Sequence, residues 1–346
     1  MILGGSNSGP KTGWAAELQK KSPELRIENG FLGAVGSLFG LLRLLKMRQD
    51  GAPKPDVVVF EYTLNDSLWL LGANISLKLV EDTLEDVVTF CAKERIGLLF
   101  LCLCLRPPEA EGEAELSRIM DDLYRRVARS RGAADCLLQA DILGRIAQTQ
   151  YVDSQHLGAT HFQLVADAVA SRLRQPIPVP RGARRGTCFD YIDAAQARIE
   201  GPGERIALKS TVFSGPFLEL GRGAASYWPA NGRPVAVMLR STERSGHYRI
   251  SVADMVIRKN AQSLARANVV NLMALHYLAQ EAPSASEVVI EMPADEATLM
   301  AEPCDLTLMD GPPLIPFEDQ KLEINGLMVY RPRSFLRRAI DAVLAR

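Results

Sequence analysis

The residue types needed for nucleophilic catalysis stand at two places about 150 positions apart in the chain. Ser6 follows an apolar start and the glycines Gly4 and Gly5, which predicts a strand, a tight turn and a hydroxyl presented where the strand ends. Asp153 and His156 form an Asp-x-x-His pair, so one turn would supply an imidazole and the carboxylate that orients it. A serine hydroxyl needs such a base within hydrogen-bond reach to act as a nucleophile. The three side chains predict nucleophilic catalysis by serine, provided that folding brings the two segments together.

The glycine-rich start also allows a nucleotide-binding interpretation. A phosphate-binding loop places Gly directly before Lys and then Ser or Thr, whereas here Pro10 precedes Lys11. Proline offers no N–H at a point where successive amides would have to hold phosphate oxygens. We therefore favour the first interpretation, a tight turn that presents Ser6 as a nucleophile and that we call the nucleophile turn. A nucleotide-binding protein stays the weaker alternative. Ser8 is a second hydroxyl in the same turn, and we expect it to bond to the local backbone instead.

The other histidines and the cysteines show no pattern typical of a metal or redox site. His161 is expected in the first turn of a helix, exposed to solvent, while His247 and His276 have no partners at metal-ligand spacing. The six cysteines are dispersed and none forms a C-x-x-C pair, so we expect reduced thiols. We expect no metal and no cofactor.

The first half of the chain alternates short apolar runs with segments of helical periodicity. Runs that are continuous in apolar types are typical of strands buried on both faces, and such alternation predicts a parallel sheet covered by helices. Thr160 and Gln163 have the spacing of a capping box at the start of the last helix. Strands are expected at residues 1–3, 57–60 and 96–105, helices at residues 77–94, 116–128 and 160–173, and a surface loop at residues 107–115.

The second half has a different character. Prolines alternate in residues 176–186, which predicts a semi-rigid linker after an α/β domain of residues 1–175. Residues 187–346 contain short β-like segments separated by Gly, Pro and Asn, and we expect a mostly β, sandwich-like domain with a closing helix at residues 334–346. Asn231-Gly232 and Asn325-Gly326 predict hairpin turns.

The composition excludes several classes of function. The chain has 40 Lys and Arg against 41 Asp and Glu, and a net charge of −1 gives no field to hold a polyanion, so we expect no nucleic-acid partner. No segment reaches the ~20 apolar residues of a membrane-spanning helix, and the start lacks a secretory signal. We expect a cytoplasmic protein, and nothing in the sequence indicates its oligomeric state.

Four segments in this order resemble the SGNH hydrolases, also called the GDSL family. The strand and turn ending in Gly5-Ser6 resemble the first block of the family, and Asn29-Gly30 followed by Gly33 resembles the second. The strand at residues 57–60 followed by Asn65-Asp66 resembles the third block, and Asp153 to His156 the last. The resemblance covers about the first 175 residues.

The resemblance implies a flavodoxin-like, three-layer fold for the first domain and a role for each matched residue. Ser6 would be the nucleophile, His156 the general base and acid, and Asp153 its orienter. The backbone amides of Ser6 and Gly33 and the side-chain amide of Asn65 would form the oxyanion hole.

Two positions depart from the family pattern. Gly5 stands where the family usually has Asp, and Thr63 replaces the usual Gly before Asn65, which would place a side chain beside the oxyanion hole. Asp66 is expected to cap the segment that follows it.

The resulting expectation is a serine esterase or acyltransferase that acts on a small acyl ester, acetyl above all, of a carbohydrate. The alternative is a binding module of hydrolase-like fold, impaired at Thr63, that holds glycan through the β domain. Tyr227 and Trp228 would suit an exposed platform for a sugar ring, although packing inside the β domain is the more ordinary role for them.

Overall fold

The computed structural model describes residues 1–106, 111–130, 135–144, 151–181, 186–209, 213–263, 272–278, 282–305 and 310–332. The chain forms two compact units, the first of Met1–Leu71 and Ser76–Thr187, and the second of Gly72–Ile75 and Cys188–Arg333. The helix expected at residues 334–346 lies outside the described residues.

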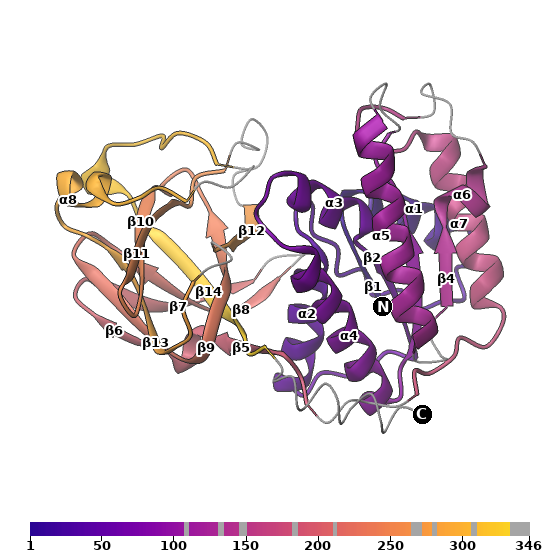
Figure 1. Ribbon diagram of the computed structural model, residues 1–346, viewed down its shortest axis with the longest axis horizontal. Coiled ribbons are helices and arrows are strands. Elements are labelled where there is room, and N and C mark those ends of the chain that lie inside the picture. The colour runs from indigo at the N-terminus through magenta and orange to yellow at the C-terminus, as the bar shows by residue number, and fades with distance from the viewer. Residues whose placement is uncertain are drawn as a thin grey trace. The chain divides into compact units, whose positions relative to one another are not determined.

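A parallel sheet of four strands forms the centre of the first unit (Figure 1). The strands follow one another across the sheet in chain order, and β3 is buried at every position because helices cover both faces. An isolated parallel bridge joins Ile2 to Asn29 on the other side of the first strand. The strands are β1 (Ile2–Gly4), β2 (Val57–Glu61), β3 (Gly97–Cys102) and β4 (Asp135–Leu138).

Two sets of helices cover the sheet. Helices α1 and α7 pack against each other over one face, while α2, α4 and α5 form a contiguous layer over the other (Figure 1). The helices are α1 (Trp14–Lys21), α2 (Ser37–Gln49), α3 (Thr63–Leu71), α4 (Leu77–Glu94), α5 (Glu111–Ser130), α6 (Gln139–Leu143) and α7 (Ala159–Leu173).

The alternation of side chains along the strands explains this layering. Val59 and Leu99 pack in one core with Trp14 of α1. Their neighbour Phe100 faces the other layer, where its ring lies 5.4 Å, edge to face, from that of Tyr124 on α5. The strands therefore present large apolar side chains to both faces, and the predicted α/β arrangement is confirmed.

The structure of the first unit differs from the sequence-based expectations in four details. The predicted surface loop is shorter, because Glu111 to Glu115 belong to α5 and residues 107–110 lie outside the described residues. The predicted strand 96–105 is regular only over Gly97–Cys102. Helix α7 begins after Gly158, which makes no side-chain cap, so Thr160 is not the capping residue. The first residues of the predicted linker are also docked, since Leu98 N–H donates to the carbonyl of Pro178 at 3.2 Å.

The second unit is mostly β, as expected, and has a ten-stranded sheet system. The strands are β5 (Phe189–Asp193), β6 (Arg198–Glu200), β7 (Gly203–Lys209), β8 (Ser214–Leu220), β9 (Ala224–Ser241), β10 (His247–Val252), β11 (Met255–Asn260), β12 (Leu272–Tyr277), β13 (Ala285–Met292) and β14 (Leu322–Tyr330), with the short helix α8 (Glu296–Ala301).

Both predicted hairpins are wrong, and the long strand β9 explains the first of them, at Asn231-Gly232. Its first part pairs with β13 and its second part with β14 and β12, so one strand joins two groups of strands. Asn231, at φ 48°, and Gly232 lie inside this strand, where a local irregularity replaces the turn.

Gly326 likewise lies inside β14, where a Cβ would meet the ring of Tyr191 at 2.4 Å. Close packing against an aromatic side chain, rather than a turn, requires this glycine.

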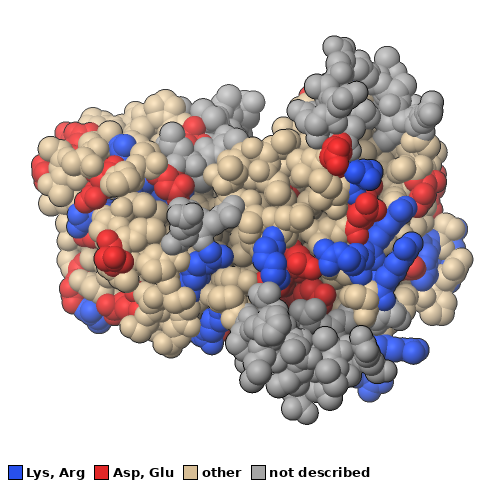
Figure 2. All heavy atoms as spheres, viewed as in Figure 1, with Lys and Arg blue, Asp and Glu red and all other residues tan. Residues whose placement is uncertain are grey.

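Charge is mixed on the face of the molecule that Figure 2 draws. Figure 2 shows basic and acidic side chains interspersed on the visible face, in keeping with the net charge of −1. In the described part of the chain, no helix is long and apolar enough to cross a membrane.

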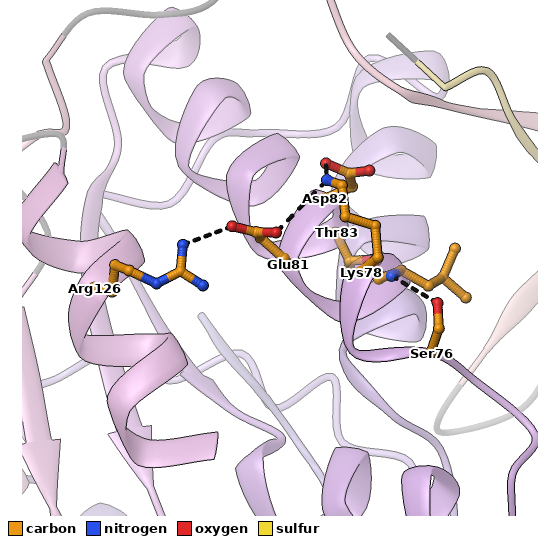
Figure 3. Close-up of polar contacts among 7 residues, drawn as sticks. Ser76, Lys78, Glu81, Asp82, Thr83 and Arg126 are labelled. Atoms are coloured by element: carbon orange, nitrogen blue, oxygen red, sulfur yellow. Dashed lines mark hydrogen bonds and ion pairs between the residues drawn. The ribbon is translucent and has the colours of Figure 1, made fainter. Parts of the chain in front are cut away.

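Helix α4 has a well-defined start (Figure 3). The Ser76 hydroxyl accepts a hydrogen bond from Leu79 N–H at 3.1 Å, and Lys78 pairs with Glu81 and Asp82 within the first turns. Glu81 also accepts from Arg126 of α5 at 2.6 Å, which joins the two helices. The helix ends as predicted, at Glu94, where Arg95 adopts φ 59°.

Removal of this cap should destabilise the fold measurably. Ser76→Ala leaves an N–H of the first turn without its side-chain acceptor, and we expect the free energy of unfolding to fall by about 1 kcal/mol in denaturant titrations. Ser76→Thr keeps a hydroxyl acceptor, so its free energy of unfolding should fall by less than half as much. Equal losses in the two variants would contradict a capping role.

Candidate active site

Three of the residues predicted from the sequence, Ser6, Gly33 and Asn65, lie at one edge of the sheet, where β1 and β2 have their carboxyl ends. Ser6 follows β1, Gly33 follows the segment that bridges to Ile2 through Asn29, and Asn65 follows β2. Because these segments lie on opposite sides of β1, the chain reverses its winding direction here, and such points form crevices in open α/β sheets.

Ser6 opens a single 3₁₀ turn, Ser6–Ser8, directly after β1. Gly5 N–H donates to the carbonyl of Glu61 at 3.1 Å, which ties the start of the turn to β2. Ser6 as a whole is half-buried.

The structure brings Ser6, His156 and Asp153 into one hydrogen-bonded chain. Ser6 Oγ lies 2.8 Å from His156 Nε2, and His156 Nδ1 lies 2.7 Å from Asp153 Oδ2. An ionised Asp153 accepts the Nδ1 proton, which leaves Nε2 as the acceptor for the hydroxyl of Ser6. The arrangement has the geometry required to transfer a proton from serine to histidine.

The loop that carries the histidine is ordered by its own carboxylate. Asp153 Oδ1 accepts the backbone N–H groups of Gln155 at 2.7 Å and of His156 at 2.8 Å. Partial burial acts to raise the pKa of Asp153, but the hydrogen bonds from the His156 ring and these two amides outweigh it and lower the pKa. Asp153 is therefore held as the anion that the ring requires. The edge is open, with the side chains of Asp153 and His156 exposed by 51% and 38%.

Two of the expected oxyanion donors, the backbone amides of Ser6 and Gly33, belong to segments that lie next to each other. A Cβ built on Gly33 would lie 3.6 Å from Ser6 Cβ, so the backbone of Gly33 is adjacent to the nucleophile turn. Neither the N–H of Ser6 nor that of Gly33 donates to a main-chain carbonyl of the described residues. Both amides are thus free of main-chain partners beside Ser6 Oγ.

Asn65 explains the glycine at position 5. A Cβ on Gly5 would lie only 2.0 Å from Asn65 Oδ1, so no larger residue fits there without displacing the amide. The departure from the family pattern at Gly5 therefore accompanies a close approach of Asn65 to the nucleophile turn. Thr63 is 1% exposed, which places its side chain inside the protein instead of in the open edge.

Asp66 caps a different helix from the one expected. Its side chain accepts Ser37 N–H at 2.7 Å, at the start of α2, and the Tyr124 hydroxyl at 2.7 Å. Burial raises its pKa to about 6, against the effect of these hydrogen bonds. Asp66 thereby connects α2 and α5 beneath Asn65.

Glu61 is a buried acid that the sequence analysis did not single out. Its Oε2 accepts the Ser8 hydroxyl at 2.7 Å, so Ser8 bonds to this carboxyl instead of the local backbone. Complete burial raises the pKa of Glu61 to about 8, although the bond from Ser8 opposes the shift. The signal was present in the sequence as a carboxylate that ends an otherwise apolar strand.

The remaining candidates lie apart from this chain of residues. His161 is 7% exposed, so the expectation of an exposed histidine is wrong. His276 is buried beside the Tyr248 hydroxyl in the second unit. Trp228 is fully buried, which removes it as a sugar platform. No group of three or more metal-binding side chains occurs within the described ranges.

The pH dependence of stability should report on Glu61. Its folded pKa lies above the ordinary value of 4.5, so the folded protein keeps a proton that the unfolded chain releases. The contribution of protonated Glu61 to the free energy of unfolding is fully present below about pH 4.5 and is lost as pH rises through about 8.

Glu61→Gln is neutral at every pH and should lose less stability than the wild type between pH 6.5 and 8.5, measured by denaturant unfolding. This range lies above the window of Asp66, whose folded pKa is about 6. Parallel curves for the two proteins would contradict a neutral buried Glu61.

Comparison with known proteins supports the architecture. No protein-family model and no curated protein matches the chain. A two-domain esterase active on acetylated mannans matches with a TM-score of 0.61 and 16% identity, over 96% of this chain and 91% of that one. The structure of this esterase co-crystallised with mannopentaose matches with a TM-score of 0.58 and 16% identity, over 96% and 90% of the two chains. The chain therefore has the fold of that two-domain esterase, and the resemblance to the SGNH hydrolases is confirmed at the level of the fold.

Proposed function

We propose that this protein is a serine esterase that removes short acyl groups, acetyl in particular, from carbohydrate esters. The observation that carries the proposal is the contact of Ser6 Oγ with His156 Nε2 at 2.8 Å, together with the 2.7 Å contact between Nδ1 and Asp153. A base in contact with a serine hydroxyl and oriented by a carboxylate is the arrangement that serine acyl transfer requires.

In the first half-reaction Ser6 Oγ attacks the ester carbonyl carbon. His156 Nε2 takes the hydroxyl proton, and the proton then passes to the alcohol oxygen of the sugar as the ester C–O bond breaks. Asp153 keeps its charge and stabilises the imidazolium formed at His156. The product is an acyl group on Ser6 and a free sugar hydroxyl.

Negative charge develops on the former carbonyl oxygen during this step. We assign the N–H groups of Ser6 and Gly33 and the side-chain amide of Asn65 as its donors, and each such donor contributes on the order of 3 kcal/mol to stabilising the transition state. The proximity of Gly33 to Ser6 and of Asn65 to Gly5 supports this assignment.

In the second half-reaction water attacks the acyl group. His156 accepts the proton of the water and returns it to Ser6 Oγ, which releases the carboxylic acid. A sugar hydroxyl in place of water would accept the acyl group and give a new sugar ester. An assay therefore measures the free acid and the new ester separately.

The openness of the site supports an ester carried on a large molecule. The exposed side chains of Asp153 and His156, and the 74% exposed Val152 beside them, leave the edge accessible to a chain of sugars. The shared two-domain fold with an esterase active on acetylated mannans supports the choice of an acetylated polysaccharide.

Substitutions at the three residues should separate their roles. Ser6→Ala and His156→Ala should each lower kcat by about 10⁴-fold or more on p-nitrophenyl acetate. Asp153→Asn should cost about 10- to 100-fold less, because the serine, the ring and the oxyanion donors remain. Near-wild-type turnover in His156→Ala would refute the proposed base.

The substrate class is tested with acetylated mannan and the same mannan after chemical deacetylation. We expect acetate release from the acetylated polymer alone, and none from the Ser6→Ala variant. A fluorophosphonate probe should label Ser6, as mapped by peptide mass, and not Ser8, whose hydroxyl is bonded to Glu61. No labelling beside an active control esterase would favour the glycan-binding alternative.

A further inference from the structure

Asn7, the residue after the candidate nucleophile, connects the two halves of the site. Its side chain is 2% exposed and points across the edge of the sheet to the loop that carries His156. Asn7 has no role in the chemistry described above, so its buried amide needs another explanation.

The Asn7 amide holds the backbone on both sides of His156. Asn7 Nδ2 donates to the carbonyl of Gln155 at 2.9 Å, and Leu157 N–H donates to Asn7 Oδ1 at 3.1 Å. Both bonds join positions about 150 residues apart. The donor and the acceptor of one amide thus bind the residues immediately before and after the candidate base.

The other described contacts of this loop run elsewhere. Asp153 bonds within the loop, Val152 N–H donates to His156 O at 2.8 Å, and Arg106 N–H donates to Ser154 O at 3.0 Å beyond the end of β3. These bonds shape the loop and attach it to β3. Among the described residues, the hydrogen bonds between the nucleophile turn and the loop are the two of Asn7 and the bond from Ser6 to His156.

The bond between Ser6 and His156 cannot itself fix the loop during catalysis. It is lost when Ser6 becomes acylated, and it must re-form when the acyl group leaves. The bonds of Asn7 are to backbone groups that do not react, so they persist through both half-reactions.

We propose that Asn7 is a positioning residue that sets the distance of the His156 ring from Ser6 throughout the reaction. The inference rests on the proposed esterase function for its kinetic consequence, whereas the clamp itself is testable without any activity.

The kinetic test compares Asn7→Ala with the wild type on p-nitrophenyl acetate. We expect kcat to fall by about 100-fold, the cost of a displacement near 1 Å, with KM changed by less than about twofold. The rate of fluorophosphonate labelling at Ser6 should fall by a similar factor. Asn7→Asp keeps the acceptor for Leu157 N–H but places a carboxylate oxygen against the Gln155 carbonyl, so it should not restore kcat.

A variant of matched stability separates positioning from general destabilisation. Val87→Ala removes buried methyl groups of α4, on an element without a residue of the site, and should lower the melting temperature while leaving kcat per folded molecule unchanged. If Asn7→Ala and Val87→Ala lose kcat equally at equal stability, the positioning role is overturned.

Hydrogen exchange provides the readout that does not depend on activity. In Asn7→Ala the amide of Leu157 should exchange at least about tenfold faster than in the wild type, while amides of β3 keep their protection. Unchanged exchange at Leu157 would overturn the clamp. Faster exchange with wild-type kcat and labelling would overturn the positioning role and leave the esterase intact. A wild-type protein without esterase activity or labelling would defeat the proposed function, and Leu157 exchange would still decide on the clamp.

Discussion

The site depends on a constraint of parallel sheets, which is that all strands end at the same edge. Ser6 leaves β1 and Asn65 follows β2 at this edge, and the bridge from Ile2 to Asn29 adds the segment that carries Gly33 on the other side of β1. Three segments separated in sequence are thus brought within reach of one hydroxyl by the register of the sheet alone. The loop of His156 is the exception, since it does not directly follow a strand of the sheet, and its hydrogen bonds to the turn of Ser6 are made through side chains. That difference gives the buried amide of Asn7 a use, because among the described residues its two bonds to the loop involve backbone groups that take no part in the proposed reaction.

Close packing under this edge of the sheet holds the amide of Asn65 in place, and it also buries the carboxyl groups of Asp66 and Glu61. Gly5 allows the amide of Asn65 to lie against the nucleophile turn, while Asp66 binds Ser37 N–H and the hydroxyl of Tyr124 below it. Glu61 lies on the strand between these groups, and burial keeps it protonated near neutral pH. Two buried acids beneath one site are costly for the fold. They are consistent with an edge shaped for function rather than for maximal stability.

The sequence predicts the parts of this structure that follow from local patterns. Apolar runs located β1, β2 and β3, the helical period located α4 over its full length, and the order of four motifs placed Ser6 and His156 in one fold. It failed where a residue serves a distant partner. Asn231-Gly232 and Asn325-Gly326 carry strong turn signals, but Gly232 lies inside β9 against Val329, and Gly326 lies inside β14 against the ring of Tyr191. The partners that override the local preference lie up to about 135 positions away, and no local rule includes them.

The same limit applies to the polar residues of the site. Ser6, Asp153 and His156 were recognisable because the proposed reaction requires those residue types in that arrangement, whereas the roles of Asn7 and Glu61 follow only from the contacts that they make in the folded protein. Asparagine is common in turns, so Asn7 after Ser6 needs no further explanation at the level of the sequence. Its second role, holding the backbone on either side of His156, is visible only from its bonds to Gln155 and Leu157 in the structure. Chemistry therefore identifies from sequence the groups that react, and the structure is needed for the groups that hold them in place. In this protein Asn7, the proposed positioning residue, is adjacent to Ser6, the proposed nucleophile, so a single short turn supplies both the hydroxyl and the two hydrogen bonds to the loop of His156.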